Sequence, residues 1–445
     1  MEKAFMDPVH GIIVVRHRWL LDLVDTPEFQ RLRRIRQLGA SFATYHGAEH
    51  TRFGHSLGAL HIMERILARL EEASGPVDQE AAVLARAAAL LHDVGHGPLS
   101  HALEGILTPG LGHEAWTQRI LLEDTAVHRR LRAVDPSLPG KVAAVLAGQA
   151  RPAWISSLVA SQLDVDRMDY LLRDALYTGA DYGRFQLDRI LHTLALDGEQ
   201  VVIHHKGLQA AEEYVLSRYF MYWRVYLHKT TRGQEVLLRA IVERAKTHGP
   251  ADPVTERLRR LWEGSGSLAD FLSVDDTDLW VALKTWAHGL DPVLADLSRR
   301  FLSRRLLKPV FPAPVPALAP EALTVAADIV ARAGYPPESY CLSDSAANVP
   351  YDPYTHHDPP GQTELFAEGP AEAGAAAFGE VSVRPRKAPQ QPILVAAASG
   401  QRVEISQLSP LIRALSRQRL AAVNLYVPEE CRPAVRQAVR SLVRG

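Results

Sequence analysis

The sequence predicts a mainly α-helical protein whose C-terminal end adds a small α+β lobe. Up to about residue 300, apolar side chains recur at the three-to-four-residue spacing of helices. At 308–316 (KPVFPAPVP) the composition changes to a stiff proline-rich stretch, which is typical of a boundary. Beyond it, short strand patterns alternate with helical ones. We therefore expect a helical domain over 1–308 and, over 309–445, a C-terminal region with a proline-rich linker and the small lobe.

The first predicted helix covers residues 25–39. Asp25, Thr26 and Pro27 supply a capping residue and a proline suited to a first turn, and Gly39 can end the helix. Between these signals the apolar residues recur at helical spacing, namely Phe29, Leu32, Ile35 and Leu38. A second, amphipathic helix is expected over 55–72.

The next predicted helix is buried. Asp78 is its expected cap, and the following run QEAAVLARAAALLHD is apolar nearly all round. The run stops at Gly95, so His92 and Asp93 fall in its last turn. Further helices are expected at about 153–176, 208–245, 254–302 and 320–334.

The C-terminal lobe is predicted from alternating patterns after residue 390. Strands are expected at PILVAAA and RVEIS, followed by a helix, a strand at AAVNLYV and a final helix from about Glu429. Residues 345–390 are rich in Pro, Gly and Ala and carry few periodic signals, so we assign no elements to them.

Composition and charge indicate a folded protein of the cell interior. Hydrophobic residues make up 47% of the 445 residues and charged residues 23%, as in ordinary folded proteins. The net charge of -1 shows no global basic bias of the kind that nucleic-acid binders have. There are two cysteines, no apolar signal segment and no apolar run of the ~20 residues that a membrane helix needs. These features indicate a reducing, cytoplasmic location without membrane contact.

Histidines and aspartates that suit a metal ion recur in three segments. His55, the adjacent pair His92 and Asp93, and Asp166 offer imidazole nitrogens and carboxylate oxygens, which bind manganese, iron, magnesium or zinc. A single His-Asp pair is common by chance, and a lone buried histidine needs only one hydrogen-bond partner. Residues 92–101 (HDVGHGPLSH), however, place three histidines around a Gly-Pro turn directly after a buried helix. This density favours metal or phosphate chemistry over a packing role.

The third of these segments, 164–174, carries a stripe of polar side chains. On a helix Asp166, Tyr170 and Asp174 repeat every four residues and share one face. Taken alone, the segment is better explained as a solvated face with ion pairs. A tyrosine between two carboxylates equally suits a metal ligand followed by contacts to a sugar, so both interpretations stay open.

The order and spacing of these motifs resemble the HD-domain deoxynucleoside triphosphate triphosphohydrolases, a family whose vertebrate members add a sterile alpha motif. The similarity spans at least residues 5–235 and resumes weakly in the tail. It is carried by the runs 7–11 (DPVHG), 25–33 (DTPEFQRLR), 37–39 (QLG), 50–58 (HTRFGHSLG), 92–101, 164–174, 224–229 (RVYLHK), 402–406 and 422–427. Such a family member has a helical HD phosphohydrolase core, which we expect over 1–308.

The resemblance implies roles for individual residues. The metal would be held by His55, His92, Asp93 and Asp166. Catalysis would involve Arg52 against the triphosphate, His96 or His113 as general acid, and Glu104 orienting a nearby histidine. The substrate would be bound by Gln37, Leu38, Arg52, His101, Arg167, Tyr170, Asp174, Arg218 and Tyr226. Among these, Leu38 and Tyr226 would press against the deoxyribose so that a 2′-hydroxyl fits poorly.

Regulation is a further implication of the resemblance. Some relatives are tetramers that nucleotides activate by binding between subunits, and Asp25, Gln30 and Arg33 match the positions that bind the activator. By spacing alone, Arg33 is an ordinary surface charge on an amphipathic helix. We expect a dimer or tetramer of the chain.

The implied reaction is cleavage of a deoxynucleoside triphosphate into a deoxynucleoside and inorganic triphosphate. The metal would polarise the α-phosphate and position a water, and a histidine would protonate the leaving 5′-oxygen. Other HD phosphohydrolases suggest an alarmone, a cyclic nucleotide or a monophosphate as alternative substrates. A different alternative is a protein that binds single-stranded nucleic acid and keeps a vestigial site. The presence of all four expected ligands argues against that last interpretation.

Overall fold

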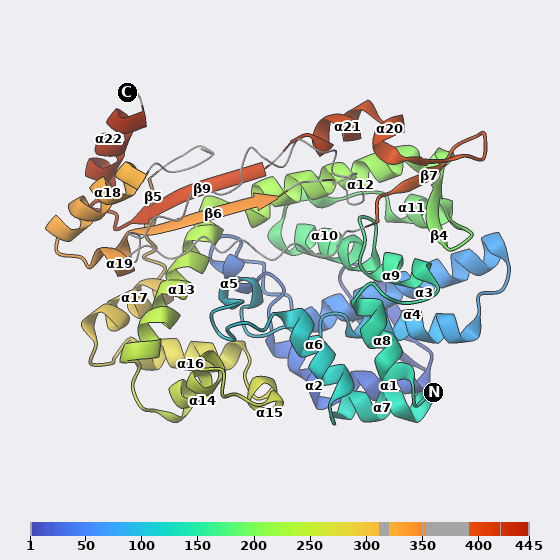
Figure 1. Cartoon of the computed structure of the whole chain (residues 1–445), viewed down its shortest axis with the longest axis horizontal. Coiled ribbons are helices and arrows are strands. Elements are labelled where there is room, and N and C mark those ends of the chain that lie inside the picture. The colour runs from blue at the N-terminus through green and yellow to red at the C-terminus, as the bar shows by residue number, and fades with distance from the viewer. Residues whose placement is uncertain (1, 311–319, 349–350, 352–390, 419, 444–445) are drawn as a thin grey trace.

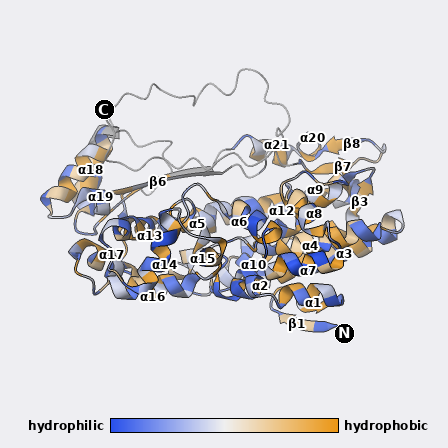
Figure 2. Ribbon diagram, turned by 60° about the horizontal axis from the view of Figure 1, so that its bottom comes forward, coloured by the Kyte–Doolittle hydropathy of each residue, from blue (hydrophilic) through white to orange (hydrophobic). Residues whose placement is uncertain are grey.

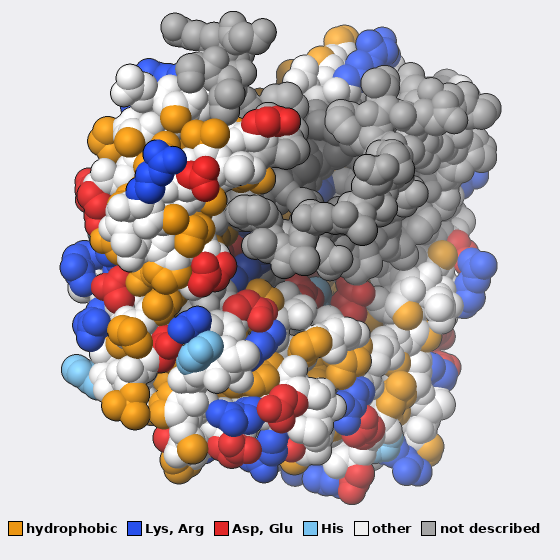
Figure 3. Space-filling view, turned by 60° about the vertical axis from the view of Figure 1, so that its left-hand side comes forward, with side chains coloured by type: hydrophobic (Ala, Val, Ile, Leu, Met, Phe, Trp, Pro, Cys, Tyr) orange, Lys and Arg blue, Asp and Glu red, His pale blue; other side chains and the backbone are white. Residues whose placement is uncertain are grey.

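The computed structural model describes residues 2–310, 320–348, 351, 391–418 and 420–443. Helices form the body of the molecule, and strands of the C-terminal region lie along one side of it (Figure 1). The predicted mainly helical class is confirmed. Among the described residues, no helix is both long and apolar enough to cross a membrane. On the face drawn in Figure 3, acidic and basic side chains are interspersed, in agreement with the net charge of -1.

The first described elements are an antiparallel hairpin of β1 (Lys3–Asp7) and β2 (Gly11–Val15), then α1 (Arg18–Val24) and α2 (Pro27–Arg31). Thr26 caps α2 through its side-chain oxygen, as its sequence suggests. The helix predicted over 25–39 was wrong beyond Arg31, where the chain continues as a short 3₁₀ turn and then extends. The cause is tertiary, because the carbonyl of Ile35 accepts a hydrogen bond from the backbone N–H of Arg52 at 3.0 Å.

Three helices form the centre of the molecule: α3 (Arg52–Ser74), α4 (Gln79–Leu91) and α10 (Val165–Thr178). α3 packs against both α4 and α10. The cap predicted for α4 is confirmed, since the Asp78 carboxylate accepts a hydrogen bond from the Ala81 N–H at 2.9 Å. The prediction that α4 is buried is confirmed as well, and apolar colour gathers on α3, α4 and α8 in Figure 2.

Further helices surround this centre. Between α4 and α10 they are α5 (Ser100–Leu103), α6 (His113–Leu122), α7 (Ala126–Val134), α8 (Leu138–Leu146) and α9 (Ala153–Val159). After α10 they are α11 (Leu187–Thr193), α12 (Leu208–Met221), α13 (Lys229–His248), α14 (Pro253–Trp262), α15 (Leu268–Leu272), α16 (Asp276–Trp286) and α17 (Pro292–Leu302).

The long helices predicted from periodicity were wrong in their continuity. The range 153–176 is α9 and α10, and Asp164 begins α10 by accepting a hydrogen bond from the Arg167 N–H at 2.8 Å. The range 208–245 is α12 and α13 with the π-helix Tyr222–Tyr226 between them. The range 254–302 is four helices, two of which begin at the capping residues Asp275 and Asp291. Each of these aspartates offers the backbone a local partner that a continuous helix lacks.

The strands beyond the first hairpin belong to two sheets. The first, in the order β3-β4-β7-β8, contains β3 (Leu194–Asp197), β4 (Gln200–His204), β7 (Leu394–Ala396) and β8 (Arg402–Glu404). The second, in the order β5-β9-β6, contains β5 (Lys308–Pro309), β9 (Leu420–Val427) and β6 (Leu342–Asn348). The β3–β4 hairpin was not predicted, although Asp-Gly at 197–198 between alternating residues is a hairpin signal.

The strands predicted at PILVAAA, RVEIS and AAVNLYV occur as β7, β8 and β9, although β7 and β8 are each only three residues long. β7 pairs in parallel with β4 of the helical part. The remaining helices are α18 (Pro320–Arg332), α19 (Pro337–Tyr340), α20 (Ile405–Leu408), α21 (Pro410–Ser416) and α22 (Arg432–Val443). The domain boundary at residue 308 stays a prediction.

Gly58 of α3 allows the close approach of α10. A Cβ atom on Gly58 would lie 1.8 Å from Asp169 Oδ1 and 2.6 Å from Arg173 Nη2. Both groups are buried and hydrogen-bonded to each other, so they have no free room to move.

Gly58→Ala is therefore expected to lower the free energy of unfolding by about 2–3 kcal/mol, as overpacking of a core does. Denaturant titration measures this. Gly140→Ala in α8 is the control, because a Cβ there meets nothing within 4 Å, and we expect it to raise stability by about 0.5–1 kcal/mol. Equal stability of Gly58→Ala and the unmodified protein would contradict the packing argument.

Candidate metal centre

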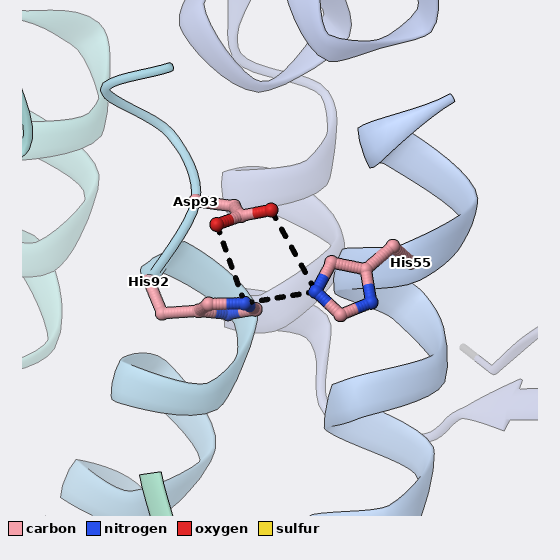
Figure 4. A group of neighbouring side chains, drawn as sticks. All are labelled: His55, His92 and Asp93. Carbon is pink, nitrogen blue, oxygen red and sulfur yellow. Dashed lines mark hydrogen bonds and ion pairs between the residues drawn. The ribbon is translucent and has the colours of Figure 1, made fainter. Parts of the chain in front are cut away.

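Four side chains from three segments gather their ligand atoms in one cluster. His55 lies on α3, His92 and Asp93 directly follow α4, and Asp166 lies on the first turn of α10. His55 Nε2 lies 3.0 Å from His92 Nε2, 3.6 Å from Asp93 Oδ2 and 3.1 Å from Asp166 Oδ1. His92 Nε2 lies 3.5 Å from Asp93 Oδ1 and 3.6 Å from Asp166 Oδ1. Figure 4 shows His55, His92 and Asp93 turned toward one another.

The orientation of both imidazoles suits a bound cation. His92 Nδ1 lies 2.9 Å from the carbonyl oxygen of Ala89, which can only accept, so this nitrogen carries the proton. His55 Nδ1 is held in the same way at 2.7 Å by the Asp169 carboxylate. In the neutral form of each ring Nε2 therefore turns a lone pair into the cluster, and two such lone pairs 3.0 Å apart repel unless a proton or a metal ion lies between them.

The spacing of the ligand atoms around the two imidazoles suits a divalent ion. Bonds of about 2.1 Å from an ion to nitrogen or oxygen place neighbouring ligand atoms about 3.0–3.4 Å apart. The two Nε2 atoms lie 3.0–3.6 Å from each other, from the nearer Asp93 oxygen of each and from Asp166 Oδ1, at or slightly above this range. His55, His92 and Asp93 form the tightest group. Imidazole with carboxylate is a donor set that iron, manganese and zinc accept, so the residues present fit the metal that their sequence predicts.

The charges in the cluster also call for a cation. Burial opposes a charge on His55, but hydrogen bonds to Asp166 and Asp169 outweigh it and raise the pKa of His55 to about 10. Burial likewise opposes ionisation of Asp93, yet Arg52 holds the pKa of this carboxyl well below its usual range. The carboxylates of the site therefore stay ionised, and they stabilise a positive charge at the imidazole nitrogens. A bound metal ion provides that charge in place of protons.

Asp169 anchors His55 and was missed by sequence reasoning. Its carboxylate, fully buried, bonds His55 Nδ1 and His10 Nε2 at 2.7 Å each, and accepts from the Arg173 guanidinium at 2.9 and 3.0 Å. Arg173 in turn bonds Asp7 of the N-terminal hairpin at 2.8 Å. Two signals were available in the sequence: His10 lies in the DPVHG run, and Asp169 lies one helical turn after Asp166.

An arginine and two histidines border the cluster on the side of Asp93. Arg52 Nη1 lies 2.6 Å from Asp93 Oδ2, and His96 Nε2 lies 3.2 Å from Asp93 Oδ1. The His96 ring stacks on His113 with centroids 4.1 Å apart, and His113 Nδ1 lies 2.6 Å from Glu104 Oε1. A pocket opens beside this row, lined in part by the same His96, Glu104 and His113. The structure thus brings four predicted catalytic residues into one row. The side chain of His101 lies outside the described residues.

A second group of predicted residues surrounds Asp174 at the other end of the stripe on α10. Asp174 is buried, accepts a hydrogen bond from the Tyr226 hydroxyl at 2.7 Å and lies 2.7 Å from His50 Nε2. Tyr170 lies edge-on to Tyr226, with ring centroids 6.2 Å apart. His50 was not predicted, although it begins the HTRFGHSLG run.

Gln37 and Leu38 lie in the loop before α3. The side-chain oxygen of Gln37 is buried and has no hydrogen-bond partner among the described residues, and Leu38 is half-buried. A buried amide oxygen without a partner costs free energy and suits a ligand that donates a hydrogen bond to it.

Two arginines predicted to bind the substrate point to the loop before α10. Arg167 forms an ion pair with Asp164, whose carboxylate also caps the helix. Arg218 of α12 donates to the side-chain oxygen of Gln162 at 2.6 Å. The oxygens that hold the two guanidinium groups thus belong to Gln162 and Asp164, which lie two positions apart. Contact of either arginine with a substrate stays a prediction.

The residues predicted to bind an activator lie apart from the cluster. Asp25 is exposed at the end of α1. Arg33 donates to Gln30 at 2.8 Å, and its guanidinium lies 3.5 Å from the ring centroid of Phe53. Gln30 itself donates to the carbonyl of Val24 at 2.7 Å. Gln30 and Arg33 are thus joined by a hydrogen bond, and nucleotide binding by the three residues stays a prediction.

Comparisons with known proteins agree with this arrangement. A family model of the HD domain matches residues 52–174, and one of the HD associated region matches residues 185–333. The chain is 38% identical to the uncharacterized protein YwfO of Bacillus subtilis, over 96% of this chain and 93% of that protein. It is 28% identical to the deoxynucleoside triphosphate triphosphohydrolase SAMHD1 of Danio rerio, over 55% of this chain and 45% of that protein. This chain thus spans about half the length of that relative.

One solved structure extends the similarity over nearly the whole chain. The crystal structure of a phosphohydrolase from Bacteroides thetaiotaomicron superposes with a TM-score of 0.79 at 28% identity, covering 96% of this chain and all of that one. This chain therefore shares its fold, including the segments that hold the cluster, with a protein named as a phosphohydrolase.

Asp169→Asn tests whether the His55–Asp169 bond prepares the cluster for a metal. Loss of the carboxylate is expected to lower the affinity for Mn²⁺ about 10–100-fold, because such partners fix the tautomer and basicity of a ligating histidine. Isothermal titration of the metal-stripped protein measures this. Asp296→Asn is the matched control, since Asp296 likewise accepts from an arginine four residues on, at 2.6 Å. An unchanged metal affinity in Asp169→Asn would contradict the assigned role.

Proposed function

The chain belongs to the HD-domain family, and from this premise we propose that it is a metal-dependent triphosphohydrolase of deoxynucleoside triphosphates. The products would be a deoxynucleoside and inorganic triphosphate. The observation that carries the proposal is the presence of two different binding groups, one beside the ligand cluster and one at the other end of the α10 stripe that begins at Asp166. Cationic and histidine side chains lie beside Asp93, and a tyrosine–carboxylate–histidine group lies around Asp174.

The first group suits a triphosphate. Arg52 and His96 both contact Asp93, so they lie within reach of any phosphate that a metal at the cluster binds. Arginine matches phosphate geometry with two parallel hydrogen bonds and stabilises the charge that develops in the transition state. When bound, a divalent ion would polarise the α-phosphate and supply an activated water. We assign Arg167, Arg218 and His101 to the outer phosphates.

Proton transfer to the leaving oxygen falls to the histidine row. Hydrolysis at the α-phosphorus breaks its bond to the 5′-oxygen, which needs a proton to leave as a hydroxyl. His113 is our candidate for the donor, because Glu104 bonds its Nδ1 at 2.6 Å and so leaves Nε2 directed elsewhere. His96, stacked on His113, is the second candidate.

The second group suits a deoxyribose. The Tyr226 hydroxyl donates to Asp174, which fixes both groups, and Tyr170 lies edge-on beside Tyr226. The unpaired side-chain oxygen of Gln37 can accept a hydrogen bond from a sugar hydroxyl. Leu38 and the Tyr226 ring would leave little room for a 2′-hydroxyl. SAMHD1 relatives, which are deoxynucleoside triphosphate triphosphohydrolases, support this choice over alarmones, cyclic nucleotides and monophosphates.

The reaction is tested by product analysis. Protein supplemented in turn with Mn²⁺, Fe²⁺, Mg²⁺ or Zn²⁺ is incubated with each dNTP, with GTP and with the alternative nucleotides, and products are separated by ion exchange. We expect deoxynucleoside and triphosphate in equal amounts, and a loss of activity of about 10³-fold or more in Asp93→Ala, which lacks a metal ligand. Pyrophosphate or orthophosphate as the sole inorganic product would contradict the proposal. Activity on GTP equal to that on dGTP would contradict the sugar assignment.

We propose further that a nucleotide activates the enzyme at the group of Asp25, Gln30 and Arg33 in a dimer or tetramer. The rate of dATP hydrolysis is expected to rise about tenfold when dGTP or GTP is added, a usual size for coupling between two sites. Arg33→Ala should lose this response and keep the basal rate. Arg18→Ala is the control, because this exposed arginine pairs only with Asp22 on its own helix. A rate that stays flat with every second nucleotide would contradict activation.

A further inference from the structure

The π-helix Tyr222–Tyr226 is the element that presents Tyr226 to Asp174. It connects α12 to α13, and the Leu227 N–H closes it by bonding the Tyr222 carbonyl at 2.9 Å. Such wide turns are rare and less favourable than α-helix, so they persist where the surrounding structure holds them. The position of the Tyr226 hydroxyl therefore depends on what fixes the two flanking helices.

Strand β9 holds the first turn of α13. The Tyr426 hydroxyl donates to the carbonyl oxygen of Lys229 at 2.7 Å, three residues after Tyr226. The Tyr426 ring also packs against Gly233, where an added Cβ would lie 2.7 Å from its Cε1. Tyr426 is fully buried, so this contact between the C-terminal sheet and α13 is a packed one.

Strand β6 holds the same turn through a buried ion pair. Arg232 Nε donates to Asp344 Oδ2 at 2.9 Å, and Arg232 Nη2 donates to Asp344 Oδ1, which makes the pair bidentate. Both side chains are nearly inaccessible, and Arg232 also pairs with Glu235 of its own helix. A buried pair of this geometry fixes the relative position of its two elements, since breaking it leaves a charge without its partner.

We propose that Asp344 and Tyr426 are positioning residues for the sugar pocket. Together they hold the first turn of α13 and so keep Tyr226 on Asp174. Residues of the C-terminal region, more than a hundred positions after the π-helix in sequence, would thus set how well the enzyme binds the deoxyribose of its substrate. This proposal rests on the proposed function for its substrate, although not for the geometry of the contact. Figure 1 shows β6 and β9 crossing near the N-terminal end of α13, and β6 packs against this helix.

The opposite end of α13 supplies a matched control. There Arg244 bonds Asp291 at 3.1 and 2.6 Å, also as a bidentate pair, and ties the last turns of the same helix to α17. Arg244 lies eighteen residues after Tyr226, which is about 27 Å along a helix. Loss of this pair costs stability without changing the turn next to the π-helix.

The test compares Asp344→Asn, Tyr426→Phe and Asp291→Asn in the full chain loaded with Mn²⁺. For Asp344→Asn we expect KM for the preferred dNTP to rise about tenfold while kcat stays within about twofold, since binding geometry changes and the reacting groups do not. Tyr426→Phe should shift KM in the same direction by less. Metal affinity should stay unchanged in all three. Hydrogen exchange of the 222–229 amides, measured without substrate, should accelerate in Asp344→Asn and Tyr426→Phe only.

Several outcomes would overturn the proposal. Unchanged KM and unchanged amide exchange in Asp344→Asn would do so, and so would an equal KM shift in Asp291→Asn at equal loss of melting temperature. If Asp344→Asn does not fold, Tyr426→Phe decides by the same two measurements. If the unmodified protein hydrolyses no dNTP, the proposed function fails, and amide exchange still tests the positioning of the π-helix by itself.

Discussion

The hydrogen bond between Asp169 and His55 is the interaction on which the rest of the centre depends. It joins α10 to α3 and directs His55 Nε2 toward the cluster. The same carboxylate holds His10 and Arg173, and through Arg173 it reaches the N-terminal hairpin. A buried carboxylate with so many charged and polar partners is stable only as a complete set, because each missing partner leaves the charge uncompensated. Gly58 has no side chain, and Asp169 and Arg173 occupy the space that a Cβ atom there would need.

Much of the fold and the ligand residues of the candidate metal centre could be predicted from local sequence, whereas the hydrogen-bond partners of those residues could not. The Asp78 cap and the buried α4 need only neighbouring residues, and the four ligands stand in short recognisable runs. The end of α2 could not be predicted, since it depends on a backbone bond from Arg52 to Ile35. The partners of the site residues were missed for the same reason. Asp169 lies 114 positions from His55, and His50 lies 124 from Asp174.

The two carboxylate oxygens of Asp93 have different neighbours in this centre. One oxygen lies near His55 and Arg52, and the other near His92 and His96. Any cation bound at the cluster therefore competes with Arg52 for the same carboxylate.

The parallel pairing of β7 with β4 has a consequence for how the chain acquires its shape. Strand β4 is complete before half of the chain has been synthesised, but its second neighbour lies almost two hundred positions later. Until that neighbour emerges from the ribosome, one edge of β4 has unpaired backbone N–H and C=O groups that can pair with a strand of another chain. Nascent or truncated chains that end in the proline-rich linker would therefore be prone to aggregate through β4. Chaperone binding would protect them until the last hundred residues are synthesised.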